Sequence, residues 1–285
     1  MARATPSSDR RARVLLVEDD ASIGHFVAMA FEDLPIELVS CPTLAIARRE
    51  LAVGEPALIL LDMMLPDGSG LHLLQSPHAR AAAGAACWVV FSAGLSPAVA
   101  QALPSLGVHR VLAKPVALKD LLACVADALA GCSARAGAGG TAATTGSRHP
   151  SERNDASGVD LDGSAEAEDA AVRQYFEGDR PLFESMKWRT LQQLPLDQRA
   201  AEAALATRNV GALQRVAHSL KTVLRMLGHP RLADRAQALE QAAADQASDS
   251  TLGQLWGQIG TSLPGAGTAS STGNPNRNMP PALRR

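Results

Sequence analysis

Short aliphatic runs recur along the first half of the chain, and each is followed by polar residues or turn residues. The clearest run is 57–61, an unbroken apolar stretch that ends at Asp62 and is followed by the turn sequence Leu65-Pro66-Asp67-Gly68. A run of this kind between turn residues is typical of a strand buried on both faces, as in the middle of a parallel sheet. Five such strands are predicted, at 13–17, 36–39, 58–61, 87–91 and 108–112.

The segments between these runs carry apolar residues at helical spacing. They predict helices at 23–31, 44–51, 97–103 and 118–130, and a short helix after Gly70, whereas the Ala-rich stretch 79–86 is expected to be loose. Strands that alternate with helices form a parallel sheet with right-handed crossovers. The pattern therefore predicts an α/β doubly wound five-stranded parallel sheet.

The second half of the chain has a different pattern, with helical spacing only. Four helices are predicted, at 168–176, 181–206, 210–227 and 230–244, with Asn209 as an N-cap and Gly228 as a C-terminal stop. Long helices joined by short loops favour an antiparallel arrangement. We therefore expect an all-α helical bundle.

These patterns divide the chain into five parts. We expect a disordered tail at 1–12, the sheet domain at 13–131, a linker at 132–165, a four-helix bundle at 166–247 and a mostly disordered tail at 248–285. The linker is rich in Gly, Ala, Ser and Thr and has no periodicity, so it should be flexible, with a span of roughly 30 Å. The last tail contains an apolar piece at 252–259 that is able to pack on the bundle.

Composition excludes several classes of protein. The 27 basic and 29 acidic side chains leave a formal charge of −2, so the charge offers no case for a nucleic acid or membrane partner. The four cysteines are scattered, the N-terminus has no apolar signal segment, and no apolar run reaches membrane-spanning length. These features predict a soluble cytoplasmic protein.

Polar residues stand at the ends of four of the five predicted strands. Glu18 and Asp19 follow the first strand, Asp62 the third, Ser92 the fourth and Lys114 the fifth. Ligands of open α/β sheets bind outside the carboxyl ends of the strands, so these side chains should meet there. Crowded carboxylates suit a hard cation such as Mg²⁺, and Asp62 could then accept a phosphoryl group as a carboxylate nucleophile. Each residue alone also fits an ordinary solvated strand end.

One helix of the predicted bundle carries a histidine away from its apolar stripe. His218 lies roughly 140° from the centre of that stripe, and Lys221, Thr222 and Arg225 adjoin it. We therefore expect a solvent-facing imidazole in a basic patch, a layout that suits a phosphoryl acceptor. The alternative is a solvated helix face that happens to include a histidine.

The first half of the chain resembles a response-regulator receiver domain, which has a flavodoxin-like fold. The resemblance rests on the acidic pair Glu18-Asp19, on Asp62 with its turn sequence, on Ser92-Ala93 and on Lys114-Pro115. It implies a Mg²⁺ site made by Asp19, Asp62 and the Met64 carbonyl, with Glu18 acting partly through water. It also implies that Ser92 and Lys114 stabilise the phosphoryl group and that the Lys114-Pro115 peptide is cis.

One position departs from the receiver pattern. Many receivers carry an aromatic residue three positions before the lysine, and that side chain reorients on phosphorylation. Here the position holds Val111. The departure puts the usual switch in doubt and leaves the phosphorylation chemistry untouched.

The bundle resembles a histidine phosphotransfer (Hpt) domain. The resemblance rests on Ala217-His218-Ser219-Leu220-Lys221, on Leu227-Gly228 and on Leu239-Glu240. Thr222 stands where the family usually has Gly, and Arg225 where a small residue is usual. Both adjoin His218, so they could crowd a docking receiver, and Arg225 could equally help to hold the phosphate.

Together the two resemblances predict a two-component phosphorelay protein. Asp62 would accept a phosphoryl group from a histidine kinase or Hpt protein, and His218 would accept and pass on phosphoryl groups. The chain has no ATP-binding kinase motif, so it should not be an enzyme, and no helix-turn-helix pattern suggests nucleic acid. Two alternatives stay open: a non-relaying adaptor or phosphate sink, and a Mg²⁺-dependent Asp-nucleophile phosphatase, although Met64 stands where such phosphatases usually carry a second Asp.

Overall fold

A computed structural model describes residues 11–135 and 162–263 of the chain. Residues 1–10 of the expected tail at 1–12, most of the expected linker at 132–165 and the last part of the expected tail at 248–285 lie outside these residues. Ala12, expected in the first tail, is the first residue of the first strand. Within the described ranges, no helix combines the length and the hydropathy that a membrane span requires.

The first half of the chain forms one parallel sheet. Its strand order is β2-β1-β3-β6-β7, and every neighbouring pair is parallel. The strands are β1 (Ala12–Val17), β2 (Ile36–Cys41), β3 (Leu58–Leu61), β6 (Cys87–Ser92) and β7 (Arg110–Ala113). All residues of the central strand β3 are buried, because helices cover both faces of the sheet. The structure confirms the predicted doubly wound fold.

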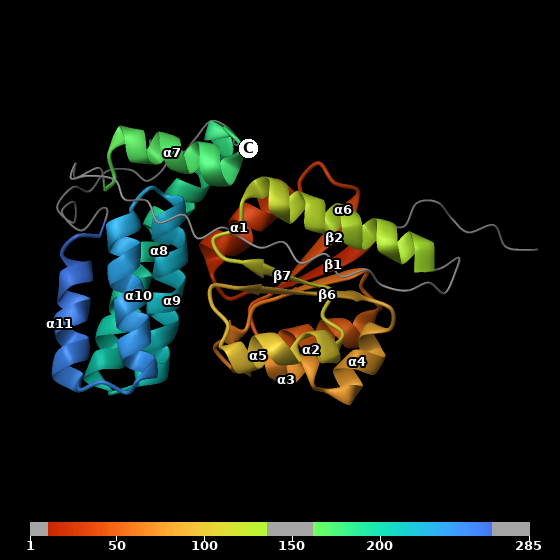
Figure 1. Ribbon diagram of the computed structural model, residues 1–285, viewed down its shortest axis with the longest axis horizontal. Coiled ribbons are helices and arrows are strands. Elements are labelled where there is room, and N and C mark those ends of the chain that lie inside the picture. Colours follow the sequence, from red (N-terminus) through yellow and green to blue (C-terminus); the bar gives the residue numbers. More distant parts are fainter. Residues whose placement is uncertain (1–10, 136–161, 264–285) are drawn as a thin grey trace, which may run out of the picture.

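Two layers of helices enclose this sheet (Figure 1). One layer is formed by α1 (Ala21–Ala30) and α6 (Leu118–Arg135), and the other by α2 (Leu44–Val53), α3 (Leu71–Leu74), α4 (Pro77–Ala83) and α5 (Pro97–Ala102), with a short 3₁₀ helix η1 at Pro104–Leu106. A small hairpin of β4 (Met64–Leu65) and β5 (Gly68–Ser69) follows β3. Part of the stretch expected to be loose is helical, because Ser76 caps α4 by accepting a hydrogen bond from the Ala79 N–H at 3.2 Å.

The second half of the described chain is entirely helical. Its helices are α7 (Ala165–Phe176), α8 (Arg180–Ala206), α9 (Val210–Met226), α10 (Pro230–Ala244) and α11 (Asp249–Gly260). Helices α8 to α11 run side by side, and α7 lies across one end of them (Figure 1). The bundle extends beyond the expected boundary at 247, because α11 buries Leu252, Trp256 and Ile259 against it.

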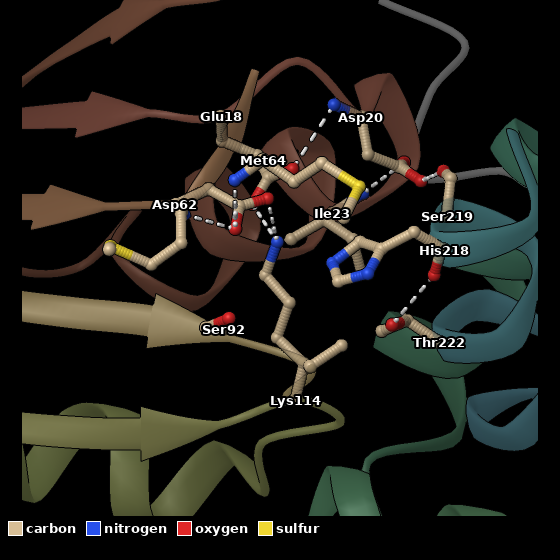
Figure 2. Close-up of polar contacts among 12 residues, drawn as sticks. Glu18, Asp20, Ile23, Asp62, Met64, Ser92, Lys114, His218, Ser219 and Thr222 are labelled. Carbon is tan, nitrogen blue, oxygen red and sulfur yellow. Dashed lines mark hydrogen bonds and ion pairs between the residues drawn. The ribbon is translucent and has the colours of Figure 1, made fainter. Parts of the chain in front are cut away.

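The two halves share one apolar core. Phe26 of α1 packs edge-to-face on Phe176 of α7 with ring centroids 5.5 Å apart, and Phe176 packs likewise on Phe183 of α8 at 5.4 Å. Beside them, the His25 Nε2 and Ser185 Oγ atoms are 2.8 Å apart. The bundle is therefore docked on α1, at the edge of the sheet domain where the parallel strands end (Figures 1 and 2).

Candidate functional site

The polar strand-end residues meet at the carboxyl edge of the sheet, as the sequence predicts. Glu18 follows β1, Asp62 follows β3, Ser92 ends β6 and Lys114 follows β7 (Figure 2). The parallel register places these four positions on adjacent strands, in the order β1, β3, β6 and β7. All four side chains are buried.

Lys114 binds two of these carboxylates. Its Nζ atom lies 2.8 Å from the Asp62 Oδ2 atom and also donates a hydrogen bond to Glu18. Burial alone would lower the pKa of Lys114, but the charges of Asp62 and Glu18 outweigh burial and raise it above its usual range. The ammonium group also lies 4.7 Å from the centre of the Phe91 ring. Lys114 is therefore a fixed positive charge, and its peptide bond to Pro115 is cis, as the resemblance implies.

The turn after β3 holds the Asp62 carboxylate in place. Its Oδ1 atom accepts hydrogen bonds from the backbone N–H groups of Met63 at 2.6 Å and Met64 at 3.3 Å. Gly70 packs against the backbone of Asp62, and a Cβ atom at position 70 would lie 2.2 Å from the Asp62 carbonyl oxygen. Gly70 is therefore required for the backbone path that presents Asp62 to the crevice.

The acidic residues fit the predicted divalent cation. Glu18, Asp19 and Asp62 each offer a carboxylate oxygen, and these atoms lie within 4.8 Å of one another. Lys114 neutralises part of this charge, while Asp19 has no ion pair within the described ranges. Burial and the nearby Asp62 charge raise the pKa of Asp19 to about 6, and burial raises the pKa of Glu18. An excess of carboxylates is the donor set that Mg²⁺ prefers.

Three other positions of the receiver pattern have well-defined surroundings. The Ser92 hydroxyl is buried and donates a hydrogen bond to the Gly94 carbonyl oxygen at 3.1 Å. Met64 lines the crevice beside Asp62. Val111 lies on the edge strand β7 and is 44% exposed.

His218 is buried, so the prediction of a solvent-facing imidazole is wrong. It lies off the apolar core of the bundle, as helix geometry predicts, but the sheet domain covers it and leaves it 6% exposed. The ring points from α9 toward Lys114 and Asp62 (Figure 2). The residue pattern of one helix does not reveal this burial, because the covering atoms come from a distant part of the chain.

The ring of His218 is oriented by Glu240 of α10. The His218 Nδ1 atom lies 2.6 Å from the Glu240 Oε1 atom, and Lys221 donates a hydrogen bond to the other oxygen of the same carboxylate. Burial alone would raise the pKa of Glu240, but these hydrogen bonds outweigh it and hold the pKa below its usual value. An ionised carboxylate only accepts, so Nδ1 carries the proton and the lone pair of the neutral ring lies on Nε2. Nε2 is buried and has no hydrogen-bond partner in the described structure.

The residues expected around His218 separate into two groups. Thr222 is buried and donates a hydrogen bond to the His218 carbonyl oxygen at 3.4 Å. Lys221 adjoins the imidazole through Glu240 and also donates to the Ala93 carbonyl oxygen of the sheet domain at 3.4 Å. Arg225 is directed elsewhere, because it forms an ion pair with Asp234 of α10. The three side chains therefore do not form the single basic patch that was predicted around His218.

Both candidate acceptors line one crevice between the sheet domain and the bundle. Ser219 of α9 closes one side of it by donating a hydrogen bond to Asp20, the N-cap of α1. The residues that line the crevice are Glu18, Asp19, Asp20, Ile23, Asp62, Met64, Lys114, Arg215, His218, Ser219 and Thr222. The sequence pattern did not reveal Asp20, Ser219 and Arg215 as crevice residues, because the crevice forms only when the two halves dock. It did not reveal the role of Glu240, because that role depends on the packing of α10 on α9.

Comparison with known proteins identifies both halves. Residues 14–126 match the response regulator receiver domain family, and residues 185–261 match the Hpt domain family. The KDP operon transcriptional regulatory protein KdpE of Escherichia coli is 31% identical over 39% of this chain and 48% of its own length. The swarming motility regulation protein RssB of Serratia marcescens is 34% identical over 38% of this chain and 49% of its own.

The chain thus spans about half the length of the curated relatives it matches. Among solved structures, a signal receiver domain from Vibrio parahaemolyticus is 28% identical, with a TM-score of 0.42, and the match covers 45% of this chain and 96% of that one. The chain thus contains a response regulator receiver domain followed by an Hpt domain, which are the domain types of two-component phosphorelays.

Proposed function

We propose that this protein relays phosphoryl groups and that Asp62 and His218 exchange a phosphoryl group within one closed molecule. The observation that carries the proposal is the shared crevice, in which the buried Nε2 atom of His218 has no hydrogen-bond partner among the described residues and faces the site of Asp62. Asp62 and His218 are 1% and 6% exposed, so an exchange between them would proceed out of contact with bulk water.

The proposed Mg²⁺ site is formed by the carboxylates of Glu18, Asp19 and Asp62, and the receiver resemblance adds the Met64 carbonyl. When bound, the cation would neutralise charge on the phosphoryl oxygens. Lys114 would bind the same group, and the Ser92 hydroxyl, which now donates to a backbone carbonyl, would turn to donate to it.

The transfer from Asp62 to His218 balances without another reactant. The lone pair of Nε2 attacks phosphorus while the bond between phosphorus and the Asp62 carboxylate oxygen breaks, and its electron pair returns to that oxygen. The proton on Nδ1 stays in its hydrogen bond to Glu240. The ring gains positive charge as the N–P bond forms, and the Glu240 carboxylate stabilises that charge. The reverse steps return the group to Asp62.

The outside partners follow from the chemistry of the two acceptors. We propose that phosphoryl groups enter or leave through a histidine kinase, another receiver or another Hpt protein, since carboxylate and imidazole acceptors exchange with each other. The phosphatase alternative has less support: a second acid two residues after Asp62 is missing, and Met64 lines the crevice there.

Full-length protein labelled with acetyl phosphate and Mg²⁺ tests the proposal. Wild type should gain a base-labile label on Asp62 and then an acid-labile, base-stable label on His218. Asp62→Asn should lose both labels, and His218→Gln should keep only the first. Because the exchange is intramolecular, its rate should not change when the protein is diluted.

Three results would contradict the proposal. A His218 label that persists in Asp62→Asn would separate the two residues. A transfer rate proportional to protein concentration would assign the exchange to two molecules. A wild-type protein that labels Asp62 and never His218 would favour the adaptor or phosphate sink.

A further inference from the structure

The crevice holds more negative than positive charge. Four carboxylates line it, from Glu18, Asp19, Asp20 and Asp62. The sheet domain supplies one cation, Lys114, which is bound to two of those carboxylates. A phosphoryl group brings roughly two further negative charges. The proposed Mg²⁺ would offset part of this charge at the carboxylates, and a cation on the histidine side that is not already engaged would stabilise the phosphoryl group there.

The Hpt domain supplies one such cation, Arg215. It lines the crevice from α9, three residues before His218, and so lies one helical turn away on the same face. Arg215 is half-buried and has no hydrogen bond or ion pair within residues 11–135 and 162–263. The other two cations expected near His218 are engaged, since Lys221 pairs with Glu240 and Arg225 pairs with Asp234.

We propose that Arg215 is a catalytic residue that binds the phosphoryl group from the histidine side of the crevice. This inference rests on the proposed exchange between Asp62 and His218. A guanidinium group presents two parallel N–H donors that match two phosphoryl oxygens. After transfer to Nε2, Lys114 stays with the released Asp62 carboxylate, and Arg215 keeps hold of the group on His218.

The two side chains that depart from the usual Hpt pattern are held by other contacts. Thr222 and Arg225 depart from the usual Hpt pattern, yet Arg225 points to Asp234 and Thr222 bonds to its own helix. Arg225 is therefore not part of the crevice lining, whereas Thr222 is. The cation that serves the reaction stands on the preceding turn of α9, where the sequence pattern after His218 gives no hint of it.

Single-turnover transfer in the full-length chain tests the role of Arg215. Protein labelled on Asp62 is followed in time for wild type, Arg215→Ala, Arg215→Lys and the control Arg225→Ala. Loss of one donor to a developing anion slows a reaction by about 100-fold. We expect a loss of about that size for Arg215→Ala, partial rescue by Arg215→Lys and a change below about twofold for Arg225→Ala. At equilibrium, the fraction of label on His218 should fall in Arg215→Ala.

The test separates catalysis from docking and from failure of the relay itself. Labelling of Asp62 by acetyl phosphate and the radius of gyration in solution should be the same in Arg215→Ala and wild type. If wild type transfers the group to His218 and Arg215→Ala does so at the same rate, only the role of Arg215 is overturned and the exchange stands. A slow variant with an expanded radius overturns it in favour of a docking role. Absence of His218 label in wild type overturns the proposed exchange and this inference together.

Discussion

Glu240 determines which ring nitrogen of His218 carries the proton and which carries the free lone pair. Its carboxylate lies 2.6 Å from Nδ1 and is itself held by Lys221, so the imidazole has a fixed tautomer and a fixed orientation. The residue belongs to α10, and only the packing of α9 on α10 brings it to the ring. A carboxylate that orients an imidazole in this way usually matters for rate more than for binding.

Replacement of Glu240 by glutamine should slow the transfer to His218. Glutamine has the same shape and no charge, and its amide is able to accept from or donate to Nδ1, so it neither selects one tautomer nor stabilises the charged ring. We expect a loss of at least about tenfold in the single-turnover rate, with unchanged labelling of Asp62. Asp234→Asn, on the same helix and outside the crevice, is the matched control. Equal rates in Glu240→Gln and wild type would remove Glu240 from the mechanism.

The same variant has a pH signature in its stability. The pKa of Glu240 is depressed in the folded protein, so its contribution to stability is present above the unfolded pKa and is lost as pH falls through the folded pKa. The difference in free energy of unfolding between wild type and Glu240→Gln should therefore be constant near neutral pH and shrink below about pH 4. Denaturant titrations of both proteins at neutral pH and below about pH 4 measure this difference. A difference that grows in acid would contradict a depressed pKa of Glu240 in the folded protein.

At the residue level, the strand-end side chains could be predicted because they depend on topology alone. In a parallel sheet the carboxyl ends of all strands share one edge, so Asp62 after β3 and Lys114 after β7, with β6 between them, lie at the same crevice. Arg215 and Glu240 could not be predicted in the same way. Their roles depend on how whole helices pack, and that packing is not encoded in any short pattern near His218.

At the level of elements, the contact between α1 and the helices α7 and α8 joins the two domains. Three phenylalanines, Phe26, Phe176 and Phe183, form a chain of edge-to-face contacts across it. Phe176 is fully buried at the centre of this chain. Aromatic pairs of this geometry stabilise by about 0.5–1.5 kcal/mol beyond the area they bury.

Truncation of Phe176 should destabilise the protein strongly. We expect Phe176→Ala to lower the free energy of unfolding by about 3–5 kcal/mol, because it leaves a cavity between two domains. Leu196→Ala, also on a bundle helix but 53% exposed, should change it by less than about 0.5 kcal/mol. Urea unfolding followed by circular dichroism measures both. A loss below about 1 kcal/mol for Phe176→Ala would show that the contact between the domains is weak in solution.

The elements themselves were largely predictable, since strands and long helices have clear periods. The expected strand at 58–61 and the expected helix at 181–206 match β3 and α8 within a residue. The errors concern two short helices, α4 and α11. Each has few apolar positions, so its hydrophobic periodicity is weak, and its start is set by an N-cap, Ser76 or Ser248.

At the level of the whole molecule, docking of the two domains buries both proposed acceptors at once. Asp62 and His218 face each other, and α9 covers the mouth of the receiver crevice. An outside protein therefore reaches either acceptor only in molecules whose domains have separated. The apparent reactivity toward outside partners is then reduced by the fraction of molecules that are open.

A variant that opens the interface should react faster with outside proteins. Ser185 is buried opposite His25, so Ser185→Arg places a long charged side chain between α8 and α1. We expect transfer from a phosphorylated Hpt protein to Asp62 to increase by at least about tenfold, and internal transfer to His218 to fall. Ala203→Arg, at an exposed position of α8, is the control. If both variants react with the outside protein at the wild-type rate, docking does not limit access.

The shared aromatic core also has a consequence for how such chains are recombined. Phe26 lies in the receiver sequence, and the two rings it depends on lie in the part that includes the Hpt domain. A chimera that joins this receiver to an Hpt domain from another protein would set Phe26 against a surface that was never matched to it. The two modules of this chain should therefore be exchanged, engineered and inherited as one unit.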